Sequence, residues 1–402
     1  MSLRDVYQCA KYLVDENLLC YIKLAMDRIF IVNGTVVLPN ALLKNAAVLI
    51  KGKKIVSVGR KIRPPKGAAV IDAEGGYVSP GFIDTHIHGS PGHIFENETS
   101  SGTTAIVIAE SCAPLDKILR KIRTIESFAK KDRLGPSVLG VRVEGPYISR
   151  EKAGAQDRRY IKAPDEKEAR RFIKSCGPLL KMMTIAPEII GTDAIIKLLK
   201  ASNVIASLGH SNATCKDAEL GIKSGANHAT HIFNAMSGPD KHRPGLSDAL
   251  LTSGKVYAEV ILDLIHVHKA LFRLLIKEKG VGKTVLVTDS VRAEYESYPQ
   301  RRGRLNVPYI READGIDRLE DGTIAGSALT MIGAVKNAVR ACGMRLTDAV
   351  RMAAANPAKL LGLERQKGAL LSGMDADIVI FDEDFNVKTT IISGEIVYNK
   401  ER

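Results

Sequence analysis

The chain has 402 residues, 45% of them hydrophobic and 26% charged, which is enough for one large domain, a smaller one and a sizeable core. No apolar run approaches the ~20 residues of a membrane-spanning helix, and charged residues interrupt the first 16 positions, where a signal peptide would need an apolar stretch. Six scattered cysteines without a Cys-x-x-Cys pair argue against a disulfide framework and against a thiolate zinc site. The sequence therefore predicts a cytoplasmic globular protein that does not bind membranes.

The net charge of +13 is compatible with a nucleic-acid partner, an anionic substrate or simply a basic surface. Basic residues are spread along the predicted helices, for example from Lys117 to Lys131, and no aromatic recognition element accompanies them. We therefore expect no nucleic-acid binding. An anionic small molecule remains open because it needs few cations.

Both ends of the chain have the pattern of short strands. An N-terminal extension, residues 1–26, carries apolar residues at helical spacing and is expected to include a short amphipathic helix. Residues 27–79 then contain β-type runs at 28–32, 46–50, 54–58 and 69–72, separated by turn signals such as Asn33-Gly34. Residues 365–402 have the same character at 377–382 and 387–398. We predict that the two ends form one accessory β-domain.

Residues 80–364 alternate between apolar strands and amphipathic helices. Eight strands are predicted, at 82–88, 104–109, 138–144, 182–187, 203–209, 228–233, 256–263 and 284–289. Helical patterns lie at 115–130, 165–176, 194–200, 213–223 and 267–279. This number of alternating elements favours an α/β fold of the (β/α)8, TIM-like barrel type over an open doubly wound sheet, which is the alternative.

Histidines and carboxylates collect at the ends of the predicted strands. They are His86, His88, Glu144, His210, His231 and Asp289. Barrel enzymes place their catalytic groups at the carboxyl ends of the strands, so these side chains are expected to converge. Imidazoles and carboxylates without thiolates suit zinc or iron(II). Any one of these residues could be an ordinary buried polar group, but the whole set favours a metal site.

Six segments, in order along the chain, carry a family resemblance. They are residues 80–88 (PGFIDTHIH), 143–147 (VEGPY), 209–214 (GHSNAT), 229–236 (ATHIFNAM), 286–289 (LVTD) and 322–331 (GTIAGSALTM). The first resembles the opening of the metal-dependent amidohydrolase superfamily. Together they are similar to the N-acetylglucosamine-6-phosphate deacetylase family, from about residue 27 to the end. The resemblance implies hydrolysis of the acetamide of N-acetyl-D-glucosamine 6-phosphate to D-glucosamine 6-phosphate and acetate, a step of amino-sugar catabolism.

The resemblance also implies the roles of the chemical groups. Glu144, His210 and His231 would be the principal metal ligands, and Asp289 would transfer the proton. His86 and His88 would hold a second ion together with Glu144 and Asp289, so one or two divalent cations, zinc or iron most readily, are expected. A cation left with net positive charge lowers the pKa of bound water from ~15.7 toward ~7. Asp289 would accept that proton and then protonate the departing amine.

The substrate contacts implied by the resemblance lie in several loops. They are Gln156, Asn234, Ala235, His242, Arg243, His266, Ile324, Ala325 and Gly326. Arg243, with His242 as the alternative, is the candidate cation for the phosphate. In this family that cation is expected to reach the pocket of a neighbouring subunit, so a homodimer is implied. His228 and His268 are expected to be structural and solvent-facing, respectively.

The chain departs from the family pattern at three positions. Gln156 stands where the family places a histidine that orients the acetyl carbonyl, and a glutamine cannot become cationic. Only residues 89–103 separate the first two barrel strands, which leaves room for one or two helical turns. Ser290 follows Asp289 where a small apolar residue is frequent.

Two other functions compete with this interpretation. Another amidohydrolase could act on a different N-acyl or cyclic amide, but such enzymes commonly use a carboxylated lysine, and the fourth predicted strand ends in Ala186-Pro187-Glu188. A non-catalytic barrel retained as a scaffold would be expected to have lost ligands, whereas this chain keeps the set.

Overall fold

Eight parallel strands form a barrel, and neighbouring strands in the barrel are consecutive along the chain. The computed structural model describes residues 28–131, 135–292, 309–311, 317–319 and 321–400. The barrel strands are β6 (Phe82–Ile87), β7 (Thr103–Glu110), β8 (Ser137–Glu144), β9 (Leu180–Ile185), β10 (Ile205–Leu208), β11 (His228–Ala229), β12 (Tyr257–Ile261) and β13 (Thr284–Val287). A parallel bridge between Ile87 and Ser290 joins the first strand to the chain that leaves the last one. The predicted (β/α)8 barrel is confirmed, and the doubly wound alternative is wrong.

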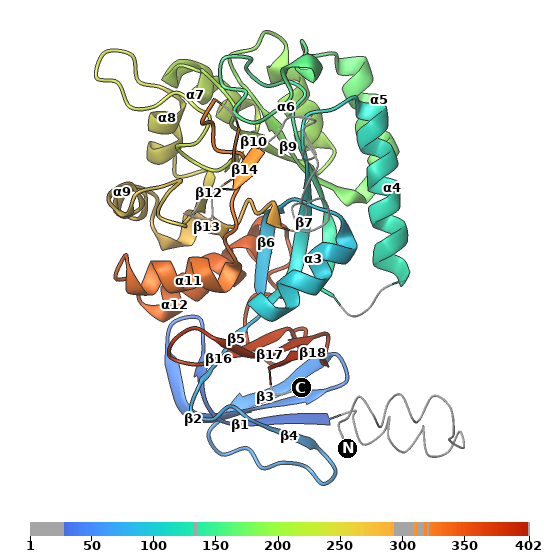
Figure 1. The fold of residues 1–402 in the computed structure, drawn as a ribbon, viewed down its shortest axis with the longest axis vertical. Coiled ribbons are helices and arrows are strands. Elements are labelled where there is room, and N and C mark those ends of the chain that lie inside the picture. The colour runs from blue at the N-terminus through green and yellow to red at the C-terminus, as the bar shows by residue number, and fades with distance from the viewer. Residues whose placement is uncertain (1–27, 132–134, 293–308, 312–316, 320, 401–402) are drawn as a thin grey trace.

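Helices cover the outside of the barrel (Figure 1). They are α3 (Pro91–Glu98), α4 (Leu115–Lys131), α5 (Glu166–Cys176), α6 (Thr192–Ala201), α7 (Cys215–Ser224), α8 (Leu246–Thr252), α9 (Lys269–Lys279), α11 (Met331–Arg340), α12 (Leu346–Val350) and α13 (Asn356–Leu360). The five predicted helices form close to their expected bounds. Helix α4 buries Ile118, Ile122 and Ile125, which share one face at a spacing of three to four residues. Helix α7 begins with a capping box between Thr214 and Asp217.

The connection between the first two barrel strands is short, as predicted. It contains the eight residues of α3 followed by a 3₁₀ turn at Thr99–Ser101. Gly102 then adopts a φ of 78°, a left-handed conformation that glycine reaches at little cost, before β7 begins. The pairing of β6 with β7 contains register shifts, as do the pairings of β7 with β8 and of β8 with β9, so the irregularity of the barrel is not confined to its shortest crossover.

Strands from both chain ends form a second sheet below the barrel in Figure 1. They are β1 (Arg28–Val37), β2 (Leu42–Lys51), β3 (Lys54–Gly59), β4 (Ala69–Asp72), β5 (Tyr77–Pro80), β16 (Ile378–Phe381), β17 (Val387–Ile392) and β18 (Glu395–Asn399). The antiparallel pairing of β5 with β16 joins the two ends directly. The accessory β-unit built from both ends is therefore confirmed. The N-terminal extension, 1–26, with its expected helix, lies outside the described residues.

The barrel and the chain-end sheet meet at Gly81, between β5 and β6. Its amide donates to the carbonyl of Asp377 at 2.9 Å, and a Cβ at this position would lie 2.2 Å from Cγ2 of Thr104. Because β6 leaves the sheet at this point, the amino end of the strand lies next to the sheet, and its carboxyl end points away. His86 and His88, the candidate ligands within residues 80–88, thus lie at the end of the barrel that is far from the chain-end sheet.

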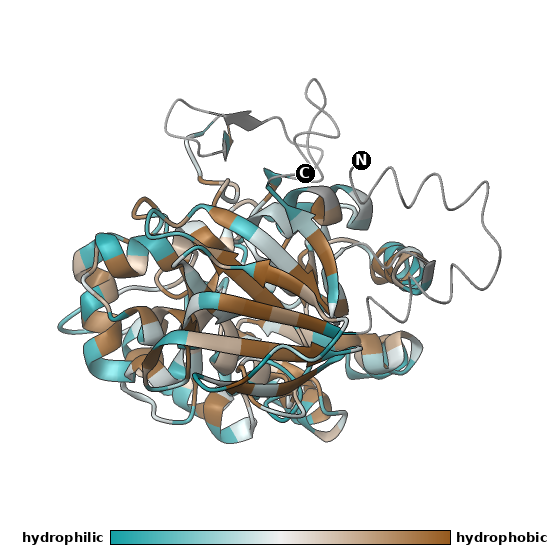
Figure 2. Ribbon diagram, turned by 90° about the horizontal axis from the view of Figure 1, so that it is seen from below, coloured by the Kyte–Doolittle hydropathy of each residue, from teal (hydrophilic) through white to brown (hydrophobic). Residues whose placement is uncertain are grey.

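Hydrophobic residues line the strands, while the outer helices alternate between hydrophobic and polar residues (Figure 2). The four described cysteines, Cys112, Cys176, Cys215 and Cys342, are unpaired. Within the described ranges, every helix is too short or too polar to cross a membrane. A further two-stranded ribbon is formed by β14 (Tyr309–Arg311) and β15 (Asp317–Leu319).

Candidate active site

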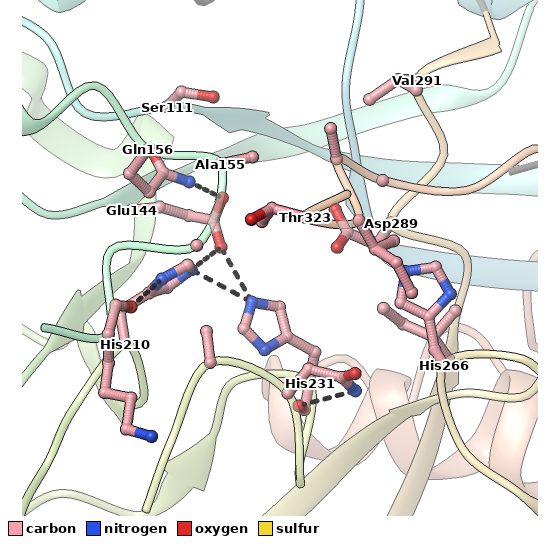
Figure 3. A pocket seen from close by; sticks show the side chains of 18 of the residues that line it. Ser111, Glu144, Ala155, Gln156, His210, His231, His266, Asp289, Val291 and Thr323 are labelled. Carbon is pink, nitrogen blue, oxygen red and sulfur yellow. Dashed lines mark hydrogen bonds and ion pairs between the residues drawn. The ribbon is translucent and has the colours of Figure 1, made fainter. Parts of the chain in front are cut away.

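A cavity of about 430 Å³ opens at the carboxyl ends of the barrel strands. Most of the predicted site residues line it: His88, Glu144, Gln156, His210, His231, Asn234, Ala235, His266, Asp289, Ile324, Ala325 and Gly326. His86 is fully buried and lies against Glu144 and Asp289. Glu144 lies between Gln156 and the two histidines His210 and His231, with Asp289 and His266 across the pocket (Figure 3). The barrel therefore brings together residues that are up to 240 positions apart.

Glu144, His210 and His231 form the first cluster that could hold a metal ion. The Nε2 atoms of His210 and His231 lie 3.2 Å apart, and Oε1 of Glu144 lies 3.6 and 3.7 Å from them. Ligand atoms around a tetrahedral zinc ion, each bonded at about 2.0 to 2.1 Å, are about 3.3 Å from one another. The three atoms are thus spaced as the vertices of a coordination shell.

Three of the residues expected to bind metal or transfer the proton have left-handed backbone conformations just after their strands. The φ angles are 47° for His210, 25° for His231 and 48° for Asp289. Such angles are costly for residues other than glycine and concentrate at functional sites. Hydrogen bonds hold the backbone there: the amide of Ser149 donates to the carbonyl of His210 at 2.8 Å, and that of Ser327 donates to the carbonyl of Asp289 at 3.0 Å. The turns aim the side chains into the pocket.

His86, His88 and Asp289 form a second cluster beside the first. Oδ1 of Asp289 lies 2.9 Å from Nε2 of His88 and 3.3 Å from Nε2 of His86. Glu144 joins the clusters, since its Oε1 lies 3.3 Å from Nε2 of His86 and its Oε2 lies 3.7 Å from Nε2 of His88. Two positions for a cation therefore share one carboxylate.

The charges of the site favour a cation. Burial and the nearby Arg142 lower the pKa of His86, but Asp289, Glu144 and Glu259 outweigh them and raise it to about 10. Burial raises the pKa of Glu144, yet His86 and the neighbouring imidazoles of His210 and His231 hold it well below the ordinary value. Carboxylates that stay ionised in a buried site carry negative charge that a bound cation would neutralise.

The donor set also fits a divalent ion. Nε2 of His86 and Oε1 of Glu144 are buried and have no hydrogen-bond partner, although polar atoms in protein interiors are nearly always paired. His210 uses its other nitrogen, since Nδ1 lies 3.1 Å from the carbonyl of Lys152 and must donate to it. Nε2 is then left as a lone-pair donor toward the pocket, as ligating histidines require.

The family is decided by comparison with known proteins. Residues 77–397 match the amidohydrolase family. The chain belongs to this family. An N-acetylglucosamine-6-phosphate deacetylase of Lysinibacillus sphaericus is 33% identical over 377 residues, which cover 90% of this chain and 96% of that protein. The crystal structure of the enzyme of that name from Pasteurella multocida aligns with a TM-score of 0.82 at 29% identity, covering 92% of this chain and 99% of the other.

A second solved structure matches this amidohydrolase equally well. It is a variant of N-acetyl-D-glucosamine-6-phosphate deacetylase from Mycobacterium smegmatis in complex with N-acetyl-D-glucosamine-6-phosphate. It aligns with a TM-score of 0.82 at 30% identity and covers 93% of this chain and 100% of the other. The resemblance carried by the six sequence segments is therefore confirmed over nearly the whole amidohydrolase chain.

Gln156 is held in one orientation beside the first cluster. Its Oε1 accepts from the backbone amide of Cys112 at 2.7 Å, and its Nε2 donates to Oε2 of Glu144 at 2.8 Å (Figure 3). Gln156 is 8% exposed. Because Cys112 occupies the amide oxygen, the NH₂ group must face Glu144 and the pocket. Gln156 thus contacts a candidate metal ligand, in addition to lining the space predicted for the acetyl group.

The residues predicted for the phosphate divide into two groups. Asn234, Ala235, His266 and the turn Ile324–Gly326 line the pocket, and Nδ1 of His266 lies 2.5 Å from Oδ2 of Asp263. His242 and Arg243 are exposed and do not line the pocket of their own chain. The pocket of this amidohydrolase instead contains two cations that the sequence interpretation did not single out, Lys152 and Arg158.

His228 and His268 lie outside the pocket, as expected. His268 is exposed and caps helix α9, where Nδ1 accepts from the amide of Ala270. His228 is fully buried, with Nδ1 2.8 Å from Oγ of Ser207. Burial is the largest cause that lowers the pKa of His228 to about 3, so it stays neutral.

Two fully buried charged residues next to the site were missed in the sequence. They are Arg142 in β8 and Glu259 in β12, which form an ion pair at 2.6 Å. Burial raises the pKa of Glu259, but Arg142 and His86 outweigh it and hold it well below the ordinary value. A signal was present, because each is a charged residue inside an apolar strand rather than at its end, and Arg142 precedes Glu144 by two positions and so points to the same side.

Proposed function

We propose that this amidohydrolase removes the acetyl group from N-acetyl-D-glucosamine 6-phosphate and releases D-glucosamine 6-phosphate and acetate. The observation that carries the proposal is the pair of clusters that share Glu144 at the base of the pocket. The relatives that cover nearly the whole chain carry the name of this activity, and one was solved with the phosphorylated N-acetyl sugar.

A divalent cation fits the first cluster, where Glu144, His210 and His231 would hold it. Such an ion supplies positive charge that polarises an amide carbonyl and lowers the pKa of water to about 7. Nitrogen and oxygen donors suit zinc or iron(II), and the second cluster of His86, His88 and Asp289 would hold a second ion beside it. We therefore expect one or two ions per chain.

Asp289 is placed to move the proton. Burial raises the pKa of Asp289, but His86 and His88 outweigh it and lower the pKa to about 2, so the carboxylate is ionised, as a general base must be before it takes a proton. It would take the proton of the attacking water and pass it to the amide nitrogen as the carbon–nitrogen bond breaks. The acetyl carbon gains the water oxygen and leaves as acetate, and the sugar keeps a free amine. No covalent intermediate with the protein is needed.

The other side of the pocket would hold the sugar phosphate. This side is lined by Asn234, by Ala235 with its backbone amide, by His266 and by the Ile324–Gly326 turn. Within this chain, Lys152 and Arg158 supply the positive charge for a phosphate dianion. His242 and Arg243 are exposed, so they can serve this pocket only from a neighbouring subunit, and the homodimer remains part of the proposal, as does a cytoplasmic location.

The alternatives are weaker. Dihydroorotase-like and aminoacylase-like enzymes use a carboxylated lysine between two metal ions. In this chain Glu144 occupies the position between the two clusters, so no lysine takes that role. A non-catalytic barrel would have no reason to keep both clusters together with Asp289.

The test is acetate release by the metal-loaded protein. N-acetyl-D-glucosamine 6-phosphate and the same sugar without phosphate are compared with zinc, iron(II), manganese or cobalt present. We expect turnover of the phosphorylated sugar and a much lower kcat/KM for the free sugar. Failure to release acetate from the phosphorylated sugar with every one of these metals would contradict the proposal.

A further inference from the structure

A buried polar network lies inside the barrel, next to the two clusters. Arg142, Glu259, His86 and His228 are all fully buried. Burying charged groups is costly unless they are paired and hydrogen-bonded, so a network of this kind in a barrel interior calls for an explanation. Glu259 is its centre, because it contacts each of the other three side chains.

One oxygen of Glu259 contacts a residue of each cluster. Oε1 lies 2.7 Å from Nδ1 of His86, which belongs to the second cluster, and accepts from the backbone amide of His231, which belongs to the first, at 2.8 Å. A carboxylate can only accept, so Nδ1 of His86 must carry the hydrogen. Nε2 is then the nitrogen of His86 that is left to ligate a cation, and it lies 3.3 Å from both Glu144 and Asp289.

The other oxygen of Glu259 is held by Arg142. Nη1 of Arg142 donates to Oε2 at 2.6 Å and to the carbonyl of Thr85 at 3.3 Å, and Nη2 donates to Oγ1 of Thr230 at 3.2 Å. A guanidinium has donors and no acceptor. The part of the residue-259 side chain that faces Arg142 must therefore be a hydrogen-bond acceptor.

We propose that Glu259 is a positioning residue for both metal positions, that it sets the tautomer with which His86 ligates the second ion, and that Arg142 fixes its orientation. The inference rests on the metal chemistry of the proposed function. It assigns to two residues outside the predicted site a measurable effect on metal binding, and it links the two positions through a single carboxylate oxygen.

The variant Glu259→Gln tests the tautomer argument. Arg142 would draw the amide oxygen of the glutamine to its own side, so the NH₂ group would face Nδ1 of His86. His86 would then have to accept at Nδ1 and carry its hydrogen on Nε2, where it can no longer ligate. We expect the affinity of the second zinc ion to fall by at least the ~10- to 100-fold typical of lost outer-shell partners. The first zinc ion should be affected less, because His231 loses only a backbone contact.

The double variant Arg142→Met/Glu259→Gln distinguishes positioning from general damage. Without Arg142 the amide can turn its oxygen back to His86, so the second zinc ion should bind more tightly than in Glu259→Gln alone. A merely structural role predicts the opposite, because two buried substitutions disturb the fold more than one. Glu110→Gln is the matched control: Glu110 is also buried, pairs with Lys121 at 3.0 Å, and should leave both affinities unchanged.

The measurement is calorimetric titration of metal-free protein with Zn²⁺, with metal content after dialysis and thermal unfolding as checks on each variant. Should Glu259→Gln fail to fold, the ¹⁵N imidazole signals of zinc-loaded wild type give the same answer, because His86 is expected to be protonated at Nδ1. Three outcomes would overturn the inference. Glu259→Gln could bind two zinc ions with wild-type affinities, the wild type could bind only one, or His86 could be unprotonated at Nδ1. A wild type that binds two ions but releases no acetate would contradict the proposed function alone.

Discussion

The two sides of the pocket are built in different ways. On the side of the two candidate metal clusters, the metal side, His86, Glu144, His210 and His231 are between 0% and 4% exposed and lie at the ends of barrel strands or directly after them. On the side proposed to hold the sugar phosphate, the loop side, most of the lining comes from loops, and Arg158, in a 3₁₀ turn, is exposed. The metal side is thus part of the barrel core, whereas the other side is placed on its surface.

This difference separates chemistry from substrate choice. A residue at the end of a buried strand is fixed by the hydrogen bonds of the sheet and by the packing around it, which keeps ligand atoms in place to a fraction of an ångström. Loop residues can change without cost to the barrel, so they are where one scaffold acquires different substrates. Perturbing the metal side should therefore affect turnover, and perturbing the loop side should affect KM.

Removing the metal should have the largest effect. A chelator such as dipicolinate is expected to abolish acetate release, and added Zn²⁺ or Fe²⁺ should restore it, because the clusters without a cation leave ionised carboxylates and unpaired lone pairs in the core. The melting temperature should fall as well, since an ion present at 100 times its Kd stabilises the fold by about 2.7 kcal/mol. Activity that survived complete removal, checked by elemental analysis, would show that the metal side is not the reaction centre.

Asp289→Asn should have the next largest effect. The amide keeps an oxygen toward His88 but cannot take a proton, so kcat should fall by ~10²- to 10⁴-fold, the usual contribution of general acid–base catalysis. The ion at Glu144, His210 and His231 should remain, which metal analysis can confirm. If the variant kept most of its rate, the proton-transfer role of Asp289 would be wrong.

The barrel and the chain-end sheet could be predicted from the sequence because their signals are local. The eight strands are short apolar runs between amphipathic helices, and the spacing of Leu115, Ile118, Ile122 and Ile125 is enough to identify the buried face of α4. The two chain ends share a strand pattern, which predicted that they form one β-unit, although β5, the strand that pairs with β16, was not itself predicted. No local pattern describes closure of the barrel, which depends on the bridge between Ile87 and Ser290.

The candidate site was predictable only as far as its motifs reach. The candidate ligand residues lie in segments that resemble a known family. Arg142 and Glu259 were missed because they become partners only when β8 and β12 face each other across the barrel. The orientation of Gln156 depends on the backbone amide of Cys112, 44 positions away. Contacts of this kind follow from the packed structure, not from any spacing along the chain.

Substitution of Gln156 should give an intermediate effect. Gln156→Ala removes the donor to Oε2 of Glu144 and leaves the amide of Cys112 without its acceptor. We expect kcat or zinc affinity to fall by ~10- to 100-fold, in keeping with lost partners of metal ligands. Gln156→His restores a donor at this position and should recover part of the loss. An alanine variant with unchanged kcat and zinc affinity would show that the hydrogen bond to Glu144 is dispensable.

The smallest effect is expected on the loop side, where adjacent arginines provide a matched pair. Arg158 lines the pocket, whereas Arg159 pairs with Asp157 at 2.6 Å and does not. Arg158→Ala should raise KM for the phosphorylated sugar about tenfold with little change in kcat, because an exposed cation contributes on the order of 1 kcal/mol to binding a dianion. Arg159→Ala should leave KM unchanged, and neither variant should alter KM for the sugar without phosphate. If Arg243→Ala raised KM and Arg158→Ala did not, the phosphate cation would come from a neighbouring subunit, and the loop side of each pocket would be completed by its partner.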